Sequence, residues 1–299
     1  MGLPAAFCLA LRAWPGLAEA ALRGLSLPAL RLLHRLTAHV PFPAAEPLAL
    51  MLIAAALPPL IAAARALAAQ NPGALRPCLR GLRRRTLCLV MALCLLWEPA
   101  RAVPAPEALP LPSARQLEWL GVALIDALNA NGARVIDPQE ALRLAPGVAG
   151  IPGGAVKAAR YPEWMRAANI SGLFVPLTGE ALVDAGAPAP LVPFTAVHEL
   201  MHLSGIADEG AANIAAWDRC MAAGGAFADS ARLWALRYAL GLLRRADGTA
   251  WRSVRAKMEG ALLRTFHICG DEAEVAFSPP VFRRGDYAAL AGYLIRQAP

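Results

Sequence analysis

The chain has 299 residues, of which 57% are hydrophobic and 17% are charged, with 29 basic and 22 acidic side chains. Soluble domains carry about 25% charged residues, so this composition indicates a membrane protein. The net charge of +7 would suit a nucleic-acid-binding protein, but the arginines cluster beside apolar runs and no aromatic-basic stacking motif accompanies them. We therefore expect a lipid bilayer as a partner, and no nucleic acid.

The N-terminal region, residues 1–97, contains three apolar stretches that predict membrane helices at about 3–14, 47–64 and 86–97. The second stretch has no charge and is about long enough to span a bilayer, although its Pro58–Pro59 pair predicts a kink. The first and third are short for spanning helices. The third also resembles the core of a signal peptide, and either interpretation places the following residues outside the cytoplasm.

Six arginines and no acidic residue lie between positions 65 and 85. The positive-inside rule predicts that this segment is a cytoplasmic loop. Residues 98–114 are rich in proline and predict a semi-rigid linker. Residues 115–299 then predict one mostly helical domain, with a small β element at 171–184, where strand-forming residues surround a turn at Gly179.

The segment HELMH, residues 198–202, is the clearest chemical signal in the chain. Histidines four residues apart lie above one another on one helix face, so the rings of His198 and His202 could bind one zinc ion. Glu199 would be the general base that takes a proton from a zinc-activated water. Two solvated surface histidines fit poorly, because the surrounding helix is apolar nearly all round and buried histidines need partners.

Two residues compete as the third ligand of this site. Asp208 completes an HExxHxxGxxD pattern, whereas Glu209 begins a segment in which Asn213, one turn later, could steady a ligand. On a continuous helix Glu209 would lie roughly 10 Å along the axis from the histidines, so the helix must break at Ser204–Gly205. We favour Glu209 as the ligand, with Asp208 as the N-cap of a second helix.

Two further residues are candidates for the chemistry. Glu180, in the strand and turn before the metal helix, could bind a substrate amine or orient a ligand, or be an ordinary turn carboxylate. His267 could stabilise an oxyanion, although a lone histidine is more often structural. Cys220 and Cys269 could form a disulfide outside the cytoplasm, but free buried thiols are slightly favoured.

The block PFTAVHELMHLSGIADEGAAN, residues 193–213, resembles the bacterial DUF3810 family. The strand segment at 171–184 and VPFPAAEPL at 40–48 are also similar to that family, so the resemblance covers most of residues 40–299. It implies a multi-pass protein of the bacterial inner membrane with a zinc-peptidase-like domain, and it implies no particular substrate. Members often carry another acid where Ala211 stands here.

Together these features predict a mainly α fold with a small β element: N-terminal transmembrane helices, then a zincin-like, gluzincin-type helical metallopeptidase domain. The expected function is zinc-dependent hydrolysis of a peptide or protein substrate by a membrane-anchored enzyme with an extracytoplasmic catalytic domain. Two alternatives remain. One is a non-catalytic membrane scaffold with a structural metal site of four protein ligands. The other is a metal-dependent hydrolase of a non-peptide amide.

Overall fold

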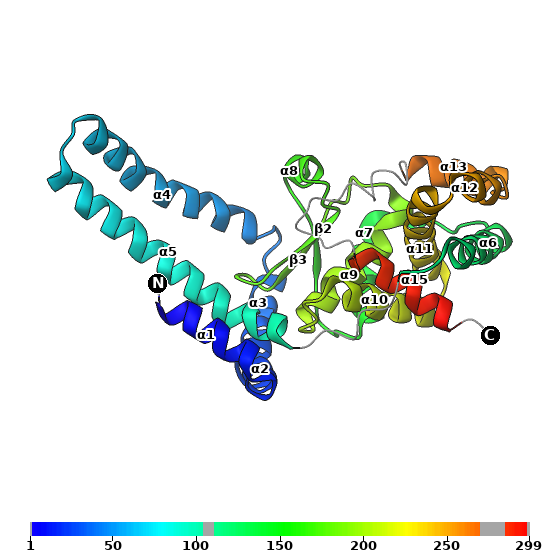
Figure 1. The fold of residues 1–299 in the computed structure, drawn as a ribbon, viewed down its shortest axis with the longest axis horizontal. Coiled ribbons are helices and arrows are strands. Elements are labelled where there is room, and N and C mark those ends of the chain that lie inside the picture. The colour runs from blue at the N-terminus through cyan, green and yellow to red at the C-terminus, as the bar shows by residue number, and fades with distance from the viewer. Residues whose placement is uncertain (1, 104–110, 270–284, 298–299) are drawn as a thin grey trace. The chain divides into compact units, whose positions relative to one another are not determined.

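The computed structural model describes residues 2–103, 111–269 and 285–297, and it is mostly helical with one three-stranded sheet (Figure 1). The prediction of a mainly α fold with a small β element is confirmed. The chain divides into two compact units, one made of residues 1–104 and 175–180, the other of 105–174 and 181–299. The second unit therefore contains the domain predicted at 115–299, except for its short segment 175–180.

The first unit is entirely helical apart from the 175–180 segment. Its elements are α1 (Gly2–Ala13), α2 (Pro15–Ala21), a π-helical turn (Leu22–Ser26), α3 (Leu27–Ala38), α4 (Ala45–Ala68) and α5 (Pro72–Ala102). The helix predicted at 3–14 corresponds to α1, which ends where Trp14 interrupts the helix before Pro15. A proline at the first position of a helix is favourable because its missing N–H would have no partner there.

Helix α4 is the one helix in the described residues that is long and apolar enough to cross a membrane. Its most apolar 18-residue window has a mean hydropathy of 2.1, and none of that window is buried in the protein. The helix continues through Pro58 and Pro59. Pro59 has no N–H to offer the carbonyl of Ala55, and the guanidinium of Arg85 on α5 donates to that carbonyl instead.

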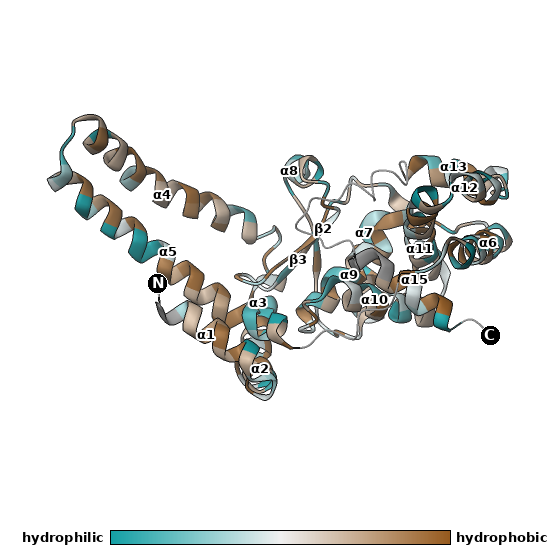
Figure 2. Cartoon of the chain, in the orientation of Figure 1, coloured by the Kyte–Doolittle hydropathy of each residue, from teal (hydrophilic) through white to brown (hydrophobic). Residues whose placement is uncertain are grey.

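Helix α5 differs from the prediction for its region. The arginines at 76–85 lie on this 31-residue helix and not in a loop, and the apolar stretch at 86–97 is its second half (Figure 2). The helix begins early because Asn71 caps it by accepting from the Ala74 backbone N–H at 3.1 Å, and because arginine is a good helix former. The first residues of the predicted linker also belong to α5, and linker residues 104–110 lie outside the described residues.

The segment 175–180 is held within the first unit by several polar contacts, among them the hydrogen bond from Thr37 Oγ1 to the Thr178 carbonyl at 3.2 Å. One carboxylate oxygen of Glu180 accepts from the Ala45 backbone N–H at the start of α4, at 2.7 Å. The other oxygen accepts from the backbone N–H of Ala44, just before that helix, at 2.9 Å. His34 Nδ1 donates to the Gly179 carbonyl at 2.8 Å. Gly179 has a φ of +66°, and a Cβ there would lie 2.7 Å from the His34 backbone nitrogen, so only glycine fits.

The second unit contains the sheet and the remaining helices. They are α6 (Ala114–Asn131), α7 (Pro138–Ala149), β1 (Val156–Ala158), α8 (Pro162–Ala167), β2 (Gly172–Val175), β3 (Glu180–Val183), a 3-10 turn (Ala189–Leu191), α9 (Val192–Leu203), α10 (Glu209–Ala223), α11 (Gly225–Ala246), α12 (Gly248–Arg255), α13 (Gly260–Ile268) and α15 (Gly285–Arg296). The strand element predicted at 171–184 is the β2–β3 pair.

The sheet has the strand order β1-β3-β2. Strand β3 pairs in parallel with β1, with Leu182 opposite Lys157. Strands β2 and β3 are joined by only four residues, a connection short enough for an antiparallel hairpin and too short for a parallel crossover. Strand β2 is therefore at an edge of the sheet.

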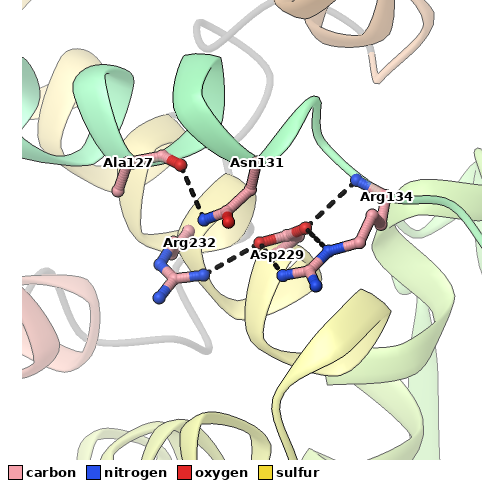
Figure 3. A network of polar contacts seen from close by, with 5 residues as sticks. All are labelled: Ala127, Asn131, Arg134, Asp229 and Arg232. Carbon is pink, nitrogen blue, oxygen red and sulfur yellow. Dashed lines mark hydrogen bonds and ion pairs between the residues drawn. The ribbon is translucent and has the colours of Figure 1, made fainter.

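The hydrophobic core of the second unit lies among α6, α11, α12, α13 and α15. A buried carboxylate also ties α11 to the chain that follows α6 (Figure 3). Asp229 has no exposed surface and accepts from the Arg134 backbone N–H at 3.1 Å, from its Nε at 2.8 Å, and from Arg232 Nη1 at 2.8 Å. Buried charges persist where they are paired and hydrogen-bonded in this way.

Candidate metal centre

Helix α9 carries the two histidines and lies almost entirely inside the second unit. All of its residues are buried except His198, which is partly buried. Its first turn is fixed to α11, because Ser230 Oγ accepts the backbone N–H of Phe194 at 3.1 Å and Trp234 Nε1 donates to the carbonyl of Leu191 at 3.1 Å. The first contact satisfies a backbone N–H that the start of every helix leaves unpaired, and both contacts hold the histidine helix in place.

Helix α9 ends where the sequence predicted a break. Gly205 has a φ of +93°, its N–H bonds to the carbonyl of His202 at 2.9 Å, and the N–H of Ile206 bonds to the carbonyl of Met201 at 3.3 Å. This pair of bonds is the Schellman motif, which needs a left-handed residue and so favours glycine. The chain therefore turns back directly after the second histidine.

Helix α10 begins four residues later with an acidic pair. The side chain of Asp208 accepts from the Ala211 backbone N–H at 2.8 Å and caps the helix. Glu209 is the first residue of α10, and its carboxylate meets both imidazole rings. The capping carboxylate is thus occupied by the backbone, whereas the neighbouring one faces the histidines.

The three side chains converge on one point. His198 Nε2 lies 3.1 Å from His202 Nε2 and 3.2 Å from one oxygen of Glu209, whose other oxygen lies 3.5 Å from His202 Nε2. Ligands at 2.0–2.1 Å from a tetrahedral zinc ion stand about 3.3 Å apart. The spacing of these three groups therefore fits a single ion held between them, and two nitrogens with one carboxylate are a donor set that suits zinc.

The orientation of each ring favours metal binding through Nε2. His202 Nδ1 donates to the carbonyl of Ile206 at 2.7 Å, which leaves the lone pair on Nε2 facing the cluster. The Nδ1 of His198 has no hydrogen-bond partner in the described part of the chain. The side chain of Glu209 is 32% exposed and that of His198 12%, so the cluster opens to the surface on the carboxylate side.

Electrostatics couple the three groups when no metal is present. Burial lowers the pKa of His202, but its hydrogen bond to Glu209 and the charges of Glu199 and Glu209 outweigh burial and raise the pKa to about 9. Burial raises the pKa of Glu209, but its hydrogen bonds to His198 and His202 outweigh burial and hold the pKa far below its usual value. At neutral pH His202 and Glu209 therefore hold a proton between them, and a bound cation would replace that proton.

Glu199 lies beside the cluster and against strand β2. Burial is the main cause that raises its pKa, opposed by the two histidines and by a hydrogen bond from the Phe174 backbone. A Cβ at Gly172 would lie 2.5 Å from Glu199 Oε1 and 2.8 Å from Thr195 Cγ2. The strand can approach α9 this closely only because residue 172 has no side chain. Sequence reasoning missed Gly172, although a glycine inside a strand is a known signal of close backbone approach.

Of the other predicted site residues, Glu180 and His267 make their contacts away from the three-residue cluster. Asn213 is buried on α10, one turn after Glu209. The Glu180 carboxylate is bonded to the start of α4, which gives it an anchoring contact. His267 is exposed on α13 and its Nδ1 bonds to the carbonyl of Leu263 in its own helix at 2.9 Å, so the structure does not bring it to the histidines.

The predicted preference for free thiols agrees with the structure. Cys220 and Cys269 are both buried and neither forms a disulfide. In each case burial raises the pKa of the thiol, to about 11 for Cys269. Both side chains are therefore protonated packing residues at neutral pH.

Fold and cluster together define a mostly helical protein with one candidate membrane helix and a two-histidine, one-carboxylate group that suits a metal ion. The family model DUF3810, described as a protein of unknown function, matches residues 23–268. Because this match covers most of the chain, the protein belongs to the DUF3810 family, as its sequence blocks indicated. No curated protein and no solved structure matches the chain.

Proposed function

We propose that the protein is a membrane-anchored, zinc-dependent metallopeptidase whose second unit is a zincin-like, gluzincin-type domain. The observation that carries this proposal is the set of separations of 3.1–3.5 Å among the donor atoms of His198, His202 and Glu209. The HExxH pattern supplies the two histidines and the general base. The Schellman turn supports the choice of Glu209 over Asp208, because it returns the chain to the histidines and leaves Asp208 to cap α10.

The residues of the chain would divide the chemistry between them. A zinc ion held by the cluster would polarise a scissile carbonyl and make water more acidic. Glu199 would take the proton from the attacking water and return it to the leaving amine. Its buried position raises its pKa, which suits a group that must both accept and release a proton near neutral pH. Strand β2, at the sheet edge beside Glu199, could align an extended peptide.

The number of ligands favours a catalytic site over a structural one. Structural zinc sites have four protein ligands, whereas catalytic sites keep one position for water or substrate. The described residues gather three candidate ligands at this point, and the partly exposed Glu209 marks the open side. A non-catalytic scaffold remains the alternative if a fourth protein ligand is found. A hydrolase of a non-peptide amide would use the same three ligands and differ only in substrate.

The membrane part of the proposal rests on α4. The uncharged stretch 47–64 and the unburied apolar window of α4 support a spanning helix, and the resemblance to the DUF3810 family supports a multi-pass protein of the bacterial inner membrane. The arginines at 65–85 support a cytoplasmic α4–α5 turn by the positive-inside rule. The apolar second half of α5 would have to return across the bilayer, and the catalytic unit would then be extracytoplasmic. A reporter fused after residue 299 tests this topology, and a cytoplasmic signal would contradict it.

The decisive experiment measures metal content and hydrolysis in matched variants of the purified full chain. We expect His198→Ala to lose zinc and activity on a peptide library. We expect Glu199→Gln to keep zinc and lose at least about 100-fold in activity, because it retains the shape but cannot accept a proton. His267→Ala is the control for loss of a histidine and should keep zinc. Equal zinc in the wild type and His198→Ala would reject the ligand assignment.

A further inference from the structure

The first unit contains an open groove of about 850 Å³ along the second half of α4. It is lined by α4 residues between Ala54 and Ala66, by Ala69 just after that helix, and by Asn71 and Ala74 at the start of α5. The groove is as large as many small-molecule sites. Its position on the apolar candidate membrane helix raises the question of what fills it.

The lining has the chemistry of an amphiphile site. Leu57, Ile61 and several alanines make the groove mostly apolar, and Leu57 and Ile61 remain 49% and 48% exposed. Its polar side chains are Arg65 and Asn71, and Asn71 Oδ1 is already engaged with the Ala74 backbone. Arg65 is therefore the one cation at an apolar groove, and it is exposed.

The surrounding charge has one sign. Residues 65–85 contain six arginines and no acidic residue. Within the described part of the chain, none of these six arginines forms an ion pair with a carboxylate. Arg85 is bonded to the Ala55 carbonyl of α4, so the arginine-bearing half of α5 runs beside the half of α4 that carries the groove. This pairing of apolar surface with unneutralised positive charge calls for an anionic, partly apolar ligand.

Two other ligand classes fit this surface poorly. Nucleic acid is recognised through aromatic stacking as well as charge, and residues 45–96 contain no aromatic side chain. A small soluble anion would satisfy Arg65 and leave the apolar lining in water, at a cost that grows with the exposed area. A phospholipid satisfies both parts of the groove at once.

We propose that the groove of α4 and α5 binds an anionic phospholipid, with an acyl chain against Leu57 and Ile61 and the phosphate at Arg65. Arg76, two residues past the groove-lining Ala74 at the start of α5, adds positive charge there. This inference rests on the proposed membrane placement of α4 and is independent of the proposed peptidase activity. Some arginines of α5 lie beside the apolar helix α4, and unpaired charge is costly in the bilayer region. Bound anionic lipid would also neutralise these arginines.

The test uses the full chain reconstituted in vesicles of equal parts phosphatidylcholine and phosphatidylglycerol, then extracted in mild detergent. Native mass spectrometry counts the lipids that each variant retains. We expect the wild type to retain phosphatidylglycerol over phosphatidylcholine, and Arg65→Gln to lower that preference about fivefold. Arg115→Gln, which removes an exposed arginine of the second unit, should leave it unchanged. No preference in the wild type, or equal losses in both variants, would overturn the proposal.

A second variant tests the apolar part of the site. Ala62→Phe fills the groove without changing the charge, so it should reduce the retained lipid while Arg65 is intact. Unchanged retention would overturn the acyl-chain contact, and so would displacement of the lipid by excess glycerol phosphate. Washing the membranes with alkaline carbonate tests the anchoring separately. Release of the chain by this wash would contradict the membrane placement. A chain that stays anchored but shows no lipid preference would contradict the lipid site alone.

Discussion

Helices α4 and α6 show how differently the two units use the same apolar residues. In α6 the buried residues fall on one stripe with helical spacing, namely Leu117, Leu120, Gly121, Leu124, Ile125 and Leu128. Helix α4 exposes apolar side chains on all sides, and its most apolar window is not buried at all. A stripe indicates a helix whose partner is protein. An apolar, unburied surface all round suits a membrane-spanning helix, for which α4 is the candidate.

The strongest test of this difference between α4 and α6 is to truncate one isoleucine in each helix. Ile125 on α6 has no exposed surface, whereas Ile53 on α4 is 59% exposed. We expect Ile125→Ala to lower the free energy of unfolding by about 3 kcal/mol, because it leaves a cavity. Ile53→Ala should cost less than about 0.5 kcal/mol in detergent. Thermal unfolding of the full chain measures both, and similar losses would mean that α4 packs against protein.

Asp229 is a buried charge of the second unit with cationic partners, and it tests what such pairing contributes to stability. Its carboxylate holds the Arg134 backbone and the two guanidinium groups of Arg134 and Arg232 (Figure 3). We expect Asp229→Ala to destabilise the fold by about 3 kcal/mol, because it leaves these donors without their acceptor. Asp126→Ala, at an exposed position of α6, is the matched control and should change stability little. A neutral result at Asp229 would show that water replaces the carboxylate.

A smaller effect is expected from the close contact between β2 and α9. Gly172→Ala puts a methyl group where Glu199 and Thr195 now lie, and overpacking of this kind costs about 2 kcal/mol. Gly147→Ala on α7 is the control, since nothing lies within 4 Å of its added Cβ. It should be neutral or slightly stabilising. Urea unfolding distinguishes the two, and equal stability would place β2 farther from Glu199.

The smallest effects concern pH, and they run in opposite directions with and without metal. In the metal-free protein the pKa of His202 is raised from 6.5 to about 9, so its contribution to stability is full below about pH 6.5 and is lost as pH rises through about 9. The lowered pKa of Glu209 adds stability above about 4.5 that is lost as pH falls.

Zinc competes with the proton on His202, so zinc affinity should rise by up to about tenfold per pH unit until about pH 9. Melting curves of the metal-free chain and zinc titrations between pH 6 and pH 9 measure the two trends. Parallel trends would contradict a shared site for the proton and the metal. The Glu209→Gln variant should flatten both curves.

The local sequence determined much of the candidate site. Four-residue spacing put His198 and His202 on one helix face, and Ser204–Gly205 specified the turn that ends α9, because left-handed backbone is favourable mainly for glycine. The sequence also favoured Asp208 as a cap and Glu209 as the carboxylate that faces the histidines. These features all lie within the short segment 198–211, so residue type and spacing are sufficient to predict them.

Only the tertiary structure decided the contacts between distant segments. It assigned the Glu180 carboxylate to the start of α4, placed the Gly172 backbone against Glu199, and put the arginines of α5 beside the groove of α4. The clustered charge predicted that the arginines at 76–85 lie in a loop. They lie on a helix, which arginine forms readily. Contacts of this kind depend on which surfaces pack together, and local spacing in the chain does not specify that choice.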